Sequence, residues 1–301
     1  MVRDKDHATP ENAMKTFLNL MVTGLLLFGF AAARAEEKVT AKNDAVLHLV
    51  VMDPLAKPLS CPCVEGYAQR DYEQLAKLLS EELGREVKVA FNESLKVALE
   101  RHTGGRADIV IGKHSVVKAD AGKLGLQLAP RLALTGKDGQ TMMTGMFVVP
   151  STDPATKLAD LKEYRIIFGA EESDEKYSAA LTALKAHQIV PGGKLETCHA
   201  CSDGALKILE LGPDVRGATV ISSYAAPLLE GCGTIKKGDL RMIGTTAPVR
   251  FIEAFVSQSL PADQQAAIEA ALLKVATRPD LLKALETKQG FVQLEAQKKS
   301  P

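Results

Sequence analysis

The stretch that decides the fold lies at residues 46–112, which contain VLHLVVM (46–52), RDYEQLAKLLSEEL (70–83), EVKVAF (86–91) and ADIVIG (107–112). The short apolar runs predict buried strands, and the spacing of apolar residues at 70–83 predicts a helix closed by Gly84. Residues 94–101 predict a second helix with Ser94 as its N-cap. The resulting β-α-β-α-β order is typical of a sheet covered by helices on both faces.

The second half of the chain repeats this alternation. We expect strands at 141–149, 164–169, 194–198 and 218–221, with helices at 174–186 and 203–211. Two strand-like pieces within 240–256 and helices at 262–276 and 279–287 then finish the chain. A second lobe inserted between the halves of the first gives this order. We therefore expect lobe one at 44–147 plus 246–301 and lobe two at 148–245.

The N-terminus carries the features of a secretory signal peptide. A basic residue, Lys15, precedes the apolar run FLNLMVTGLLLFGF at 17–30, and Ala-Arg-Ala follows at 33–35. An uncleaved anchor is the alternative, but about 14 apolar residues are fewer than the roughly 20 that span a bilayer. We expect a signal peptide at 1–35, with 1–13 as an extra extension if Met14 is the true start. The mature chain would then be periplasmic or otherwise exported, with no stable membrane span.

Composition and motifs exclude several functions. The 37 Lys and Arg residues balance 37 Asp and Glu residues, which argues against a nucleic-acid partner. The chain has no P-loop, no G-x-S-x-G, no H-E-x-x-H and no dinucleotide fingerprint. We therefore expect neither an enzyme nor a bound organic cofactor.

Three segments resemble the phosphate/phosphite/phosphonate-binding proteins of ABC importers: YEQLAKLLSEELGREVKV (72–89), NESLKVALERHTGGRADIVIG (92–112) and LADLKEYRIIF (158–168). In the third, Glu163 stands where the family pattern has Gly. The resemblance spans about 46–294 and implies a type II periplasmic-binding-protein fold, in which two hinge strands join two α/β lobes around a ligand cleft. It also implies a solute-binding protein that captures a small ligand, an oxyanion such as phosphate or phosphonate, by lobe closure. The partner would be an ABC permease or a sensor.

The family holds its anion with hydroxyls, helix-start N–H groups and tyrosines, and it uses acidic residues to receive an amino group. By position in this sequence, the resemblance implies the ligand-binding candidates Ser115, Ser173, Tyr177, Ser222 and Tyr224, and Glu171 of the acidic loop at 170–177 is a further candidate. Tyr67, Arg70 and Tyr72 are candidates because they open the helix that follows the first cleft loop, where an Arg and tyrosine hydroxyls can orient a carboxylate or phosphate. For Arg70 and the tyrosines at 67 and 72, ordinary packing and surface pairing are equally good interpretations.

The loop at 170–177 departs from the family pattern because it has four carboxylates, Glu171, Glu172, Asp174 and Glu175, within five residues. Such a loop would repel a phosphonate. One interpretation is acidic capping of the following helix. The other is that one or two carboxylates face the cleft and meet an amine, a guanidinium or a metal.

Two cysteine pairs follow predicted strands in different lobes: Cys61 and Cys63 in Cys-Pro-Cys, and Cys198 and Cys201 in Cys-His-Ala-Cys. Disulfide formation by these cysteines is one expectation for an exported protein, and Cys232 would then be an unpaired cysteine. The alternatives are a soft metal ion such as Cu(I) or Zn held by thiolates, with His199 as a further ligand, or a redox-active C-x-x-C. A metal-binding or thiol-redox protein on the same scaffold is thus the alternative function.

Overall fold

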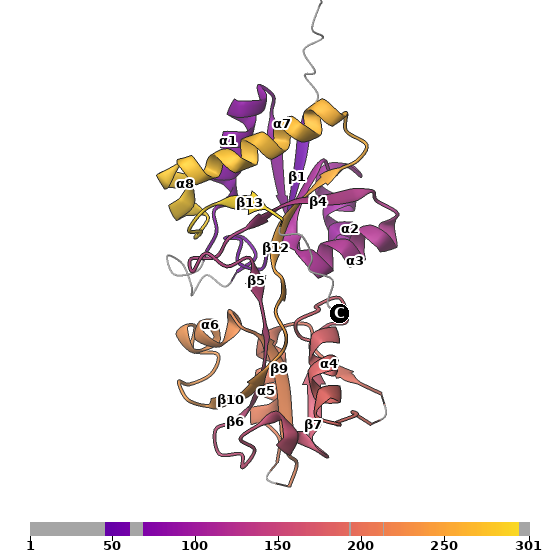
Figure 1. The fold of residues 1–301 in the computed structure, drawn as a ribbon, viewed down its shortest axis with the longest axis vertical. Coiled ribbons are helices and arrows are strands. Elements are labelled where there is room, and N and C mark those ends of the chain that lie inside the picture. The colour runs from indigo at the N-terminus through magenta and orange to yellow at the C-terminus, as the bar shows by residue number, and fades with distance from the viewer. Residues whose placement is uncertain (1–45, 61–68, 193, 213, 295–301) are drawn as a thin grey trace, which may run out of the picture. The chain divides into compact units, whose positions relative to one another are not determined.

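A computed structural model describes residues 46–60, 69–192, 194–212 and 214–294 (Figure 1). The predicted signal peptide, Cys61, Cys63 and Tyr67 lie outside these residues. In the part of the chain that the structure describes, no helix is long and apolar enough to cross a membrane.

Lobe one is built on a six-stranded mixed sheet in the order β13-β4-β12-β3-β1-β2. Its strands are β1 (Leu47–Met52), β2 (Val87–Phe91), β3 (Ile109–Lys113), β4 (Leu128–Leu134), β12 (Ile252–Ser257) and β13 (Phe291–Gln293). β1 pairs in parallel with β2 and β3, whereas β12 is antiparallel to both β3 and β4. The predicted β-α-β-α-β start is therefore confirmed.

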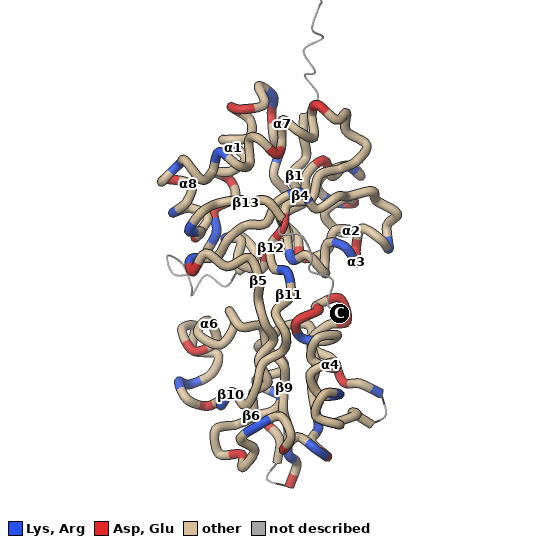
Figure 2. The backbone as a smooth tube through the Cα atoms, in the orientation of Figure 1, with Lys and Arg blue, Asp and Glu red and all other residues tan. Residues whose placement is uncertain are grey.

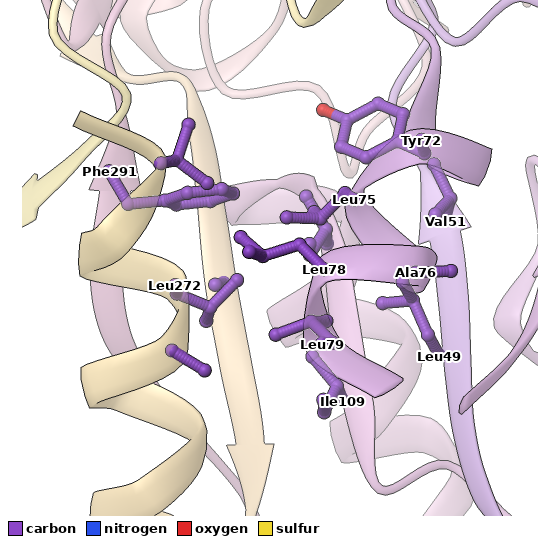
Figure 3. Packing of buried hydrophobic residues seen from close by; sticks show 14 of the residues in the cluster. Leu49, Val51, Tyr72, Leu75, Ala76, Leu78, Leu79, Ile109, Leu272 and Phe291 are labelled. Atoms are coloured by element: carbon purple, nitrogen blue, oxygen red, sulfur yellow. The ribbon is translucent and has the colours of Figure 1, made fainter. Parts of the chain in front are cut away.

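Helices cover both faces of this sheet. They are α1 (Tyr72–Leu83), α2 (Leu95–Ala98) with a π-helix at Leu99–Thr103, α3 (His114–Leu124), α7 (Ala262–Leu273) with a 3-10 turn at Lys274–Thr277, and α8 (Pro279–Ala284). Leu49 and Val51 of β1 point into the cluster with α1 and α7 that Figure 3 shows, while Val50 packs with α2 and α3 on the other face. Burial on both faces explains why β1 is almost continuously apolar.

Lobe two is built on a five-stranded sheet in the order β10-β6-β9-β7-β8. Its strands are β6 (Gly145–Pro150), β7 (Arg165–Phe168), β8 (Glu196–Thr197), β9 (Gly217–Ser222) and β10 (Leu240–Thr245). Its helices are a 3-10 turn at Leu158–Leu161, α4 (Ser178–Ala186), α5 (Cys201–Leu209) and α6 (Ala225–Gly231). One apolar cluster joins the sheet to α4, and another joins it to α5 and α6.

The chain crosses between the two sheets twice. β5 (Met142–Met143) leads from lobe one to lobe two and β11 (Val249–Arg250) leads back, and the two pair as an antiparallel ribbon (Figure 1). The single strand expected at 141–149 is thus split into β5 and β6. This arrangement matches the expected fold of two α/β lobes joined by two hinge strands.

Local signals in the sequence explain several element boundaries. α1 begins after Asp71, whose side chain accepts the backbone N–H of Glu73, and it ends at Gly84 in the left-handed region at φ 61°. Glu163, the residue at the family's glycine position, has φ 68°. A left-handed conformation costs a residue with a Cβ about 1–2 kcal/mol, so this position carries strain that glycine would not.

Two expected boundaries near the cleft differ. The strand expected to end at residue 112 continues to Lys113, and His114 and Ser115 begin α3. The helix expected at 174–186 begins only at Ser178, because residues 170–177 form turns. These turns bring the acidic loop back toward β3, and this placement shapes the site.

Candidate functional site

A cavity of about 290 Å³ lies between the lobes, at the carboxyl ends of the strands. In open α/β sheets these ends form the usual ligand crevice. Lobe one lines it with Met52, Pro54, Glu93, Lys113 and Val116. Lobe two lines it with Ala170, Glu172, Ser173, Lys176, the segment 199–202, Tyr224, Ala225, Leu228 and Leu229. A ligand in this cavity would therefore contact both lobes.

The strongest contact across the cleft is an ion pair between Lys113 and Glu175. Lys113 Nζ lies 2.5 Å from Glu175 Oε1 and donates to Ser173 Oγ at 3.4 Å. Ser222 Oγ also donates to Glu175 Oε1, at 2.7 Å. Lys113 comes from β3 of lobe one, and the other three residues belong to lobe two.

Glu175 is charged in this setting. Its burial raises the pKa of its carboxyl, but the charge of Lys113 and the hydrogen bonds from Lys113 and Ser222 outweigh burial and bring the pKa below its ordinary value. The second oxygen, Oε2, is buried without a hydrogen-bond partner. The acidic loop thus does present a carboxylate to a cation, as one interpretation of the sequence holds, and that cation is a lysine of the protein itself.

The other carboxylates of the acidic loop, red next to α4 in Figure 2, have different surroundings. Glu171 is exposed, whereas Glu172 reaches the cavity. The backbone N–H of Asp174 donates to Ser115 Oγ at 3.2 Å, so Ser115 also bridges the lobes. Tyr177 faces away from the cavity and packs edge-on against Phe168 in the core of lobe two.

Lys176 is a second buried cation at the cavity. Its side chain lines the wall, and its Nζ donates to the carbonyl oxygen of His199 at 3.3 Å. An ammonium has three donors, so this bond leaves capacity for a ligand. The start of α5 lies beside it, because residues 199–202 line the same cavity. A helix start carries a partial positive charge and N–H groups that favour an anion.

Tyr224 closes the cavity on the hinge side. Its ring stacks on Phe251 at 5.4 Å between centroids. Burial raises the pKa of Tyr224 well above its ordinary value, with further contributions from the Cys201 thiol and the Glu175 carboxylate. The phenol is therefore protonated at neutral pH.

The structure places Arg70 and Tyr72 away from this cavity. Asp53 Oδ2 accepts Arg70 Nη1 at 2.8 Å and the Tyr72 hydroxyl at 2.5 Å, and all three side chains are buried. Burial and the Asp53 charge raise the pKa of Tyr72 well above its ordinary value. Arg70 instead lines a second cavity of about 450 Å³ on the hinge side, with Tyr224 and Phe251. A ligand role for these two residues stays a prediction.

The two described cysteines of the C-x-x-C are half-buried and free of disulfides, as is Cys232. Cys198 Sγ donates to the Phe168 carbonyl at 3.3 Å, and burial raises the pKa of this thiol. Cys201 Sγ accepts the backbone N–H of Ser222 at 3.4 Å and lines the cavity. Within the described ranges, no group of three or more His, Cys, Asp or Glu side chains is placed to hold a metal ion.

The sequence predicts Ser115, Ser173, Ser222 and Tyr224 as ligand-binding residues. The structure places all four in the cavity wall or in the hydrogen bonds beside it. The sequence did not predict Lys113 and Lys176, which line the cavity, or Asp53, which binds Arg70 and Tyr72. Two of these had a readable signal, because Asp53 and Lys113 are charged residues at the carboxyl ends of buried strands, where a crevice is expected.

Comparison with known proteins agrees with this architecture. A family model described as the periplasmic substrate-binding protein of phosphonate ABC transporters matches residues 66–299. A search of curated proteins finds no significant match.

Solved structures of similar fold come from several bacteria. A binding-protein component of an ABC phosphonate transporter from Pseudomonas aeruginosa has a TM-score of 0.63 at 13% identity, covering 84% of this chain and 82% of that one. PhnD1 from Prochlorococcus marinus, in complex with methylphosphonate, has a TM-score of 0.61 at 14% identity, covering 84% and 94%. A Xanthomonas citri protein bound to chloride has a TM-score of 0.61 at 18% identity, covering 83% and 92%.

The structural similarity establishes a type II periplasmic-binding-protein fold, and the family match covers most of the chain. The protein belongs to the phosphonate family of periplasmic substrate-binding proteins of ABC transporters.

Proposed function

We propose that this protein captures a small oxyanion in the cavity between its lobes and presents it to an ABC permease or sensor. The observation that carries the proposal is the lining of that cavity, to which both lobes contribute and in which Lys176 and the start of α5 face the space. A ligand that contacts both lobes stabilises the closed conformation, in which the lobes lie together. A permease can recognise that conformation.

The charges around the cavity narrow the class of ligand. The cavity wall carries two ammonium groups, from Lys113 and Lys176, and two carboxylates, from Glu93 and Glu172. Glu175, paired with Lys113, is a third carboxylate, so the negative charges exceed the positive ones by one. A doubly charged phosphonate would meet net repulsion. An oxyanion that also carries an ammonium group, such as an aminoalkylphosphonate, would place its anionic end at Lys176 and α5 and its cation toward the carboxylates.

Export to the periplasm and the absence of catalysis complete the proposal. Both are supported by the family, whose members are periplasmic substrate-binding components. The signal peptide expected at 1–35 would direct the export. Tyr67, Arg70, Tyr72, Glu171 and Tyr177 remain proposed ligand residues on their position in the sequence alone.

A thermal-shift screen tests the proposal with phosphate, methylphosphonate, 2-aminoethylphosphonate, Zn²⁺ and Cu(I), in reducing and oxidising buffer. A ligand present at about 100 times its dissociation constant stabilises the native state by about 2.7 kcal/mol, which raises the melting temperature. We expect the largest rise with the aminophosphonate and its loss in Lys176→Met.

The matched control is Lys185→Met, an exposed lysine on α4, which should respond as the wild type does. A melting temperature that no oxyanion raises, or a shift seen only with Zn²⁺ or Cu(I), would contradict the proposal. The second of these results would favour the metal-binding alternative.

A further inference from the structure

Lys113 and Glu175 form an ion pair that is both buried and shared between the two lobes. They lie 62 residues apart in sequence and in different lobes, and their side chains are 9% and 1% exposed. The ion pairs Lys96–Glu100 and Arg165–Glu196, in contrast, lie within single lobes and are largely exposed at the lysine or arginine. We propose that Lys113 and Glu175 form a latch that holds the two lobes together by protein contacts alone.

The lobe-two half of the latch is held rigidly. Ser222 Oγ, at the end of β9, donates to the same Glu175 oxygen that Lys113 reaches. Gly145, the first residue of β6, packs so closely that a Cβ there would lie 2.0 Å from the Glu175 carbonyl oxygen. These contacts within lobe two position the Glu175 carboxylate for Lys113.

Besides the hydrogen bond from Lys113 to Ser173, two further contacts cross the cleft beside the latch. The Asp174 N–H donates to Ser115 Oγ, one residue away from the Glu175 contact. An exposed pair joins His199 to Glu93 at 3.8 Å. The exposed pair contributes little. The buried pair and its neighbouring hydrogen bond therefore account for most of the polar attachment between these loops.

The latch is built to release. When the lobes part, water solvates both charges, which offsets much of the attraction that burial gives them. Glu175 Oε2 has no hydrogen-bond partner while the lobes are together, and that unmet acceptor further reduces the net gain. Lys113 lines the ligand cavity, so the latch and the ligand share one wall. The protein would thus populate the joined state before any ligand arrives, which tightens apparent binding of a ligand that selects that state.

The test needs no ligand, so its outcome is separate from that of the proposed function. Small-angle X-ray scattering and amide hydrogen exchange are measured on the wild type, Lys113→Met and the double variant Lys113→Met/Glu175→Gln. The double variant leaves no buried charge unpaired, so it keeps the test valid if the single variant folds poorly. Lys118→Met, an exposed lysine on α3, the helix that follows Lys113, is the control.

Lys113→Met leaves Glu175 buried without its partner, which shifts such an equilibrium by roughly 100-fold or more, whereas the double variant loses only the net contribution of the pair. We therefore expect a larger radius of gyration in Lys113→Met and a smaller increase in the double variant, with circular dichroism unchanged in the double variant. We also expect faster exchange of the Asp174 amide, while Lys118→Met matches the wild type. A folded double variant with the wild-type scattering curve and wild-type Asp174 exchange would overturn the proposal.

Discussion

Asp53 binds Arg70 and Tyr72 in the core of lobe one, so substitutions here test whether these residues stabilise the fold or bind the ligand. In Asp53→Ala, the Arg70 guanidinium, 3% exposed, and the fully buried Tyr72 hydroxyl lose their common acceptor. Removing one partner of a buried ion pair costs about 3–5 kcal/mol. We expect the free energy of unfolding to fall by that amount, which is a large fraction of the stability of an ordinary domain.

Tyr72→Phe removes only the hydroxyl, while Asp53 keeps Arg70 and the backbone N–H of Leu55. A hydrogen bond to a charged group contributes about 1.5–3 kcal/mol, so the loss should be smaller than in Asp53→Ala. Asp71→Ala is the control on a neighbouring carboxylate, which caps α1 and whose loss should cost about 1 kcal/mol.

Urea unfolding measures all three variants, and an unchanged m-value would show that the change is in stability. If the free energy of unfolding fell by less than about 1 kcal/mol in Asp53→Ala, the ion pair would not be buried as described, because such a value fits an exposed pair. Ligand binding by Tyr72→Phe then separates the two roles of this residue, because a hydroxyl that serves only Asp53 is not needed for binding. A folded Tyr72→Phe protein that no longer binds would instead show that Tyr72 is a ligand residue, as the family resemblance implies.

Three other predictions follow from local geometry. Gly145→Ala should lower stability by about 1–3 kcal/mol in thermal melts, because its Cβ would meet the Glu175 carbonyl oxygen at 2.0 Å; a wild-type melt would count against that close packing. Glu163→Gly should raise the free energy of unfolding by up to about 1 kcal/mol, since relief of the φ 68° strain exceeds the added chain entropy; a lower value would contradict this. Arg165 and Lys207 lower the pKa of the Glu196 carboxyl to about 2. The ionised carboxylate therefore adds under about 1 kcal/mol to the free energy of unfolding, since the pair lies at the surface. This stabilisation is fully present above pH 4.5 and is lost as the pH falls from 4.5 toward 2. Unfolding curves of Glu196→Gln should therefore differ from wild type at pH 7 and converge near pH 2, and a constant gap would be the contrary result.

Much of the fold is readable from the sequence because burial leaves a periodic trace. β1 and α1 show uninterrupted apolar patterns, and Gly84 marks the end of α1. The elements that sequence reasoning missed lack such a trace. α3 buries only Val117 and Ala121, and β4 contains Pro130, which argues against a strand. β13 has three residues and depends on pairing with β4.

The site is less readable because its contacts join distant residues. The acidic loop shows four carboxylates in sequence, but only the three-dimensional structure shows that Glu175 meets Lys113 while Glu171 faces solvent. In the same way, Tyr72 matches a family motif, yet its hydroxyl is bound to Asp53 in the core. Composition and local pattern cannot encode such pairings, since they depend on where two turns bring their side chains.

The central claim is that the ligand binds in the cavity between the lobes. Titration calorimetry with 2-aminoethylphosphonate tests it most directly on Ala200→Trp, which fills the cavity wall at the start of α5, and on Ala186→Trp, at the exposed end of α4. We expect one site per chain in the wild type and in Ala186→Trp, and no heat of binding in Ala200→Trp. Binding that survives in Ala200→Trp with wild-type affinity would place the ligand elsewhere and contradict the claim.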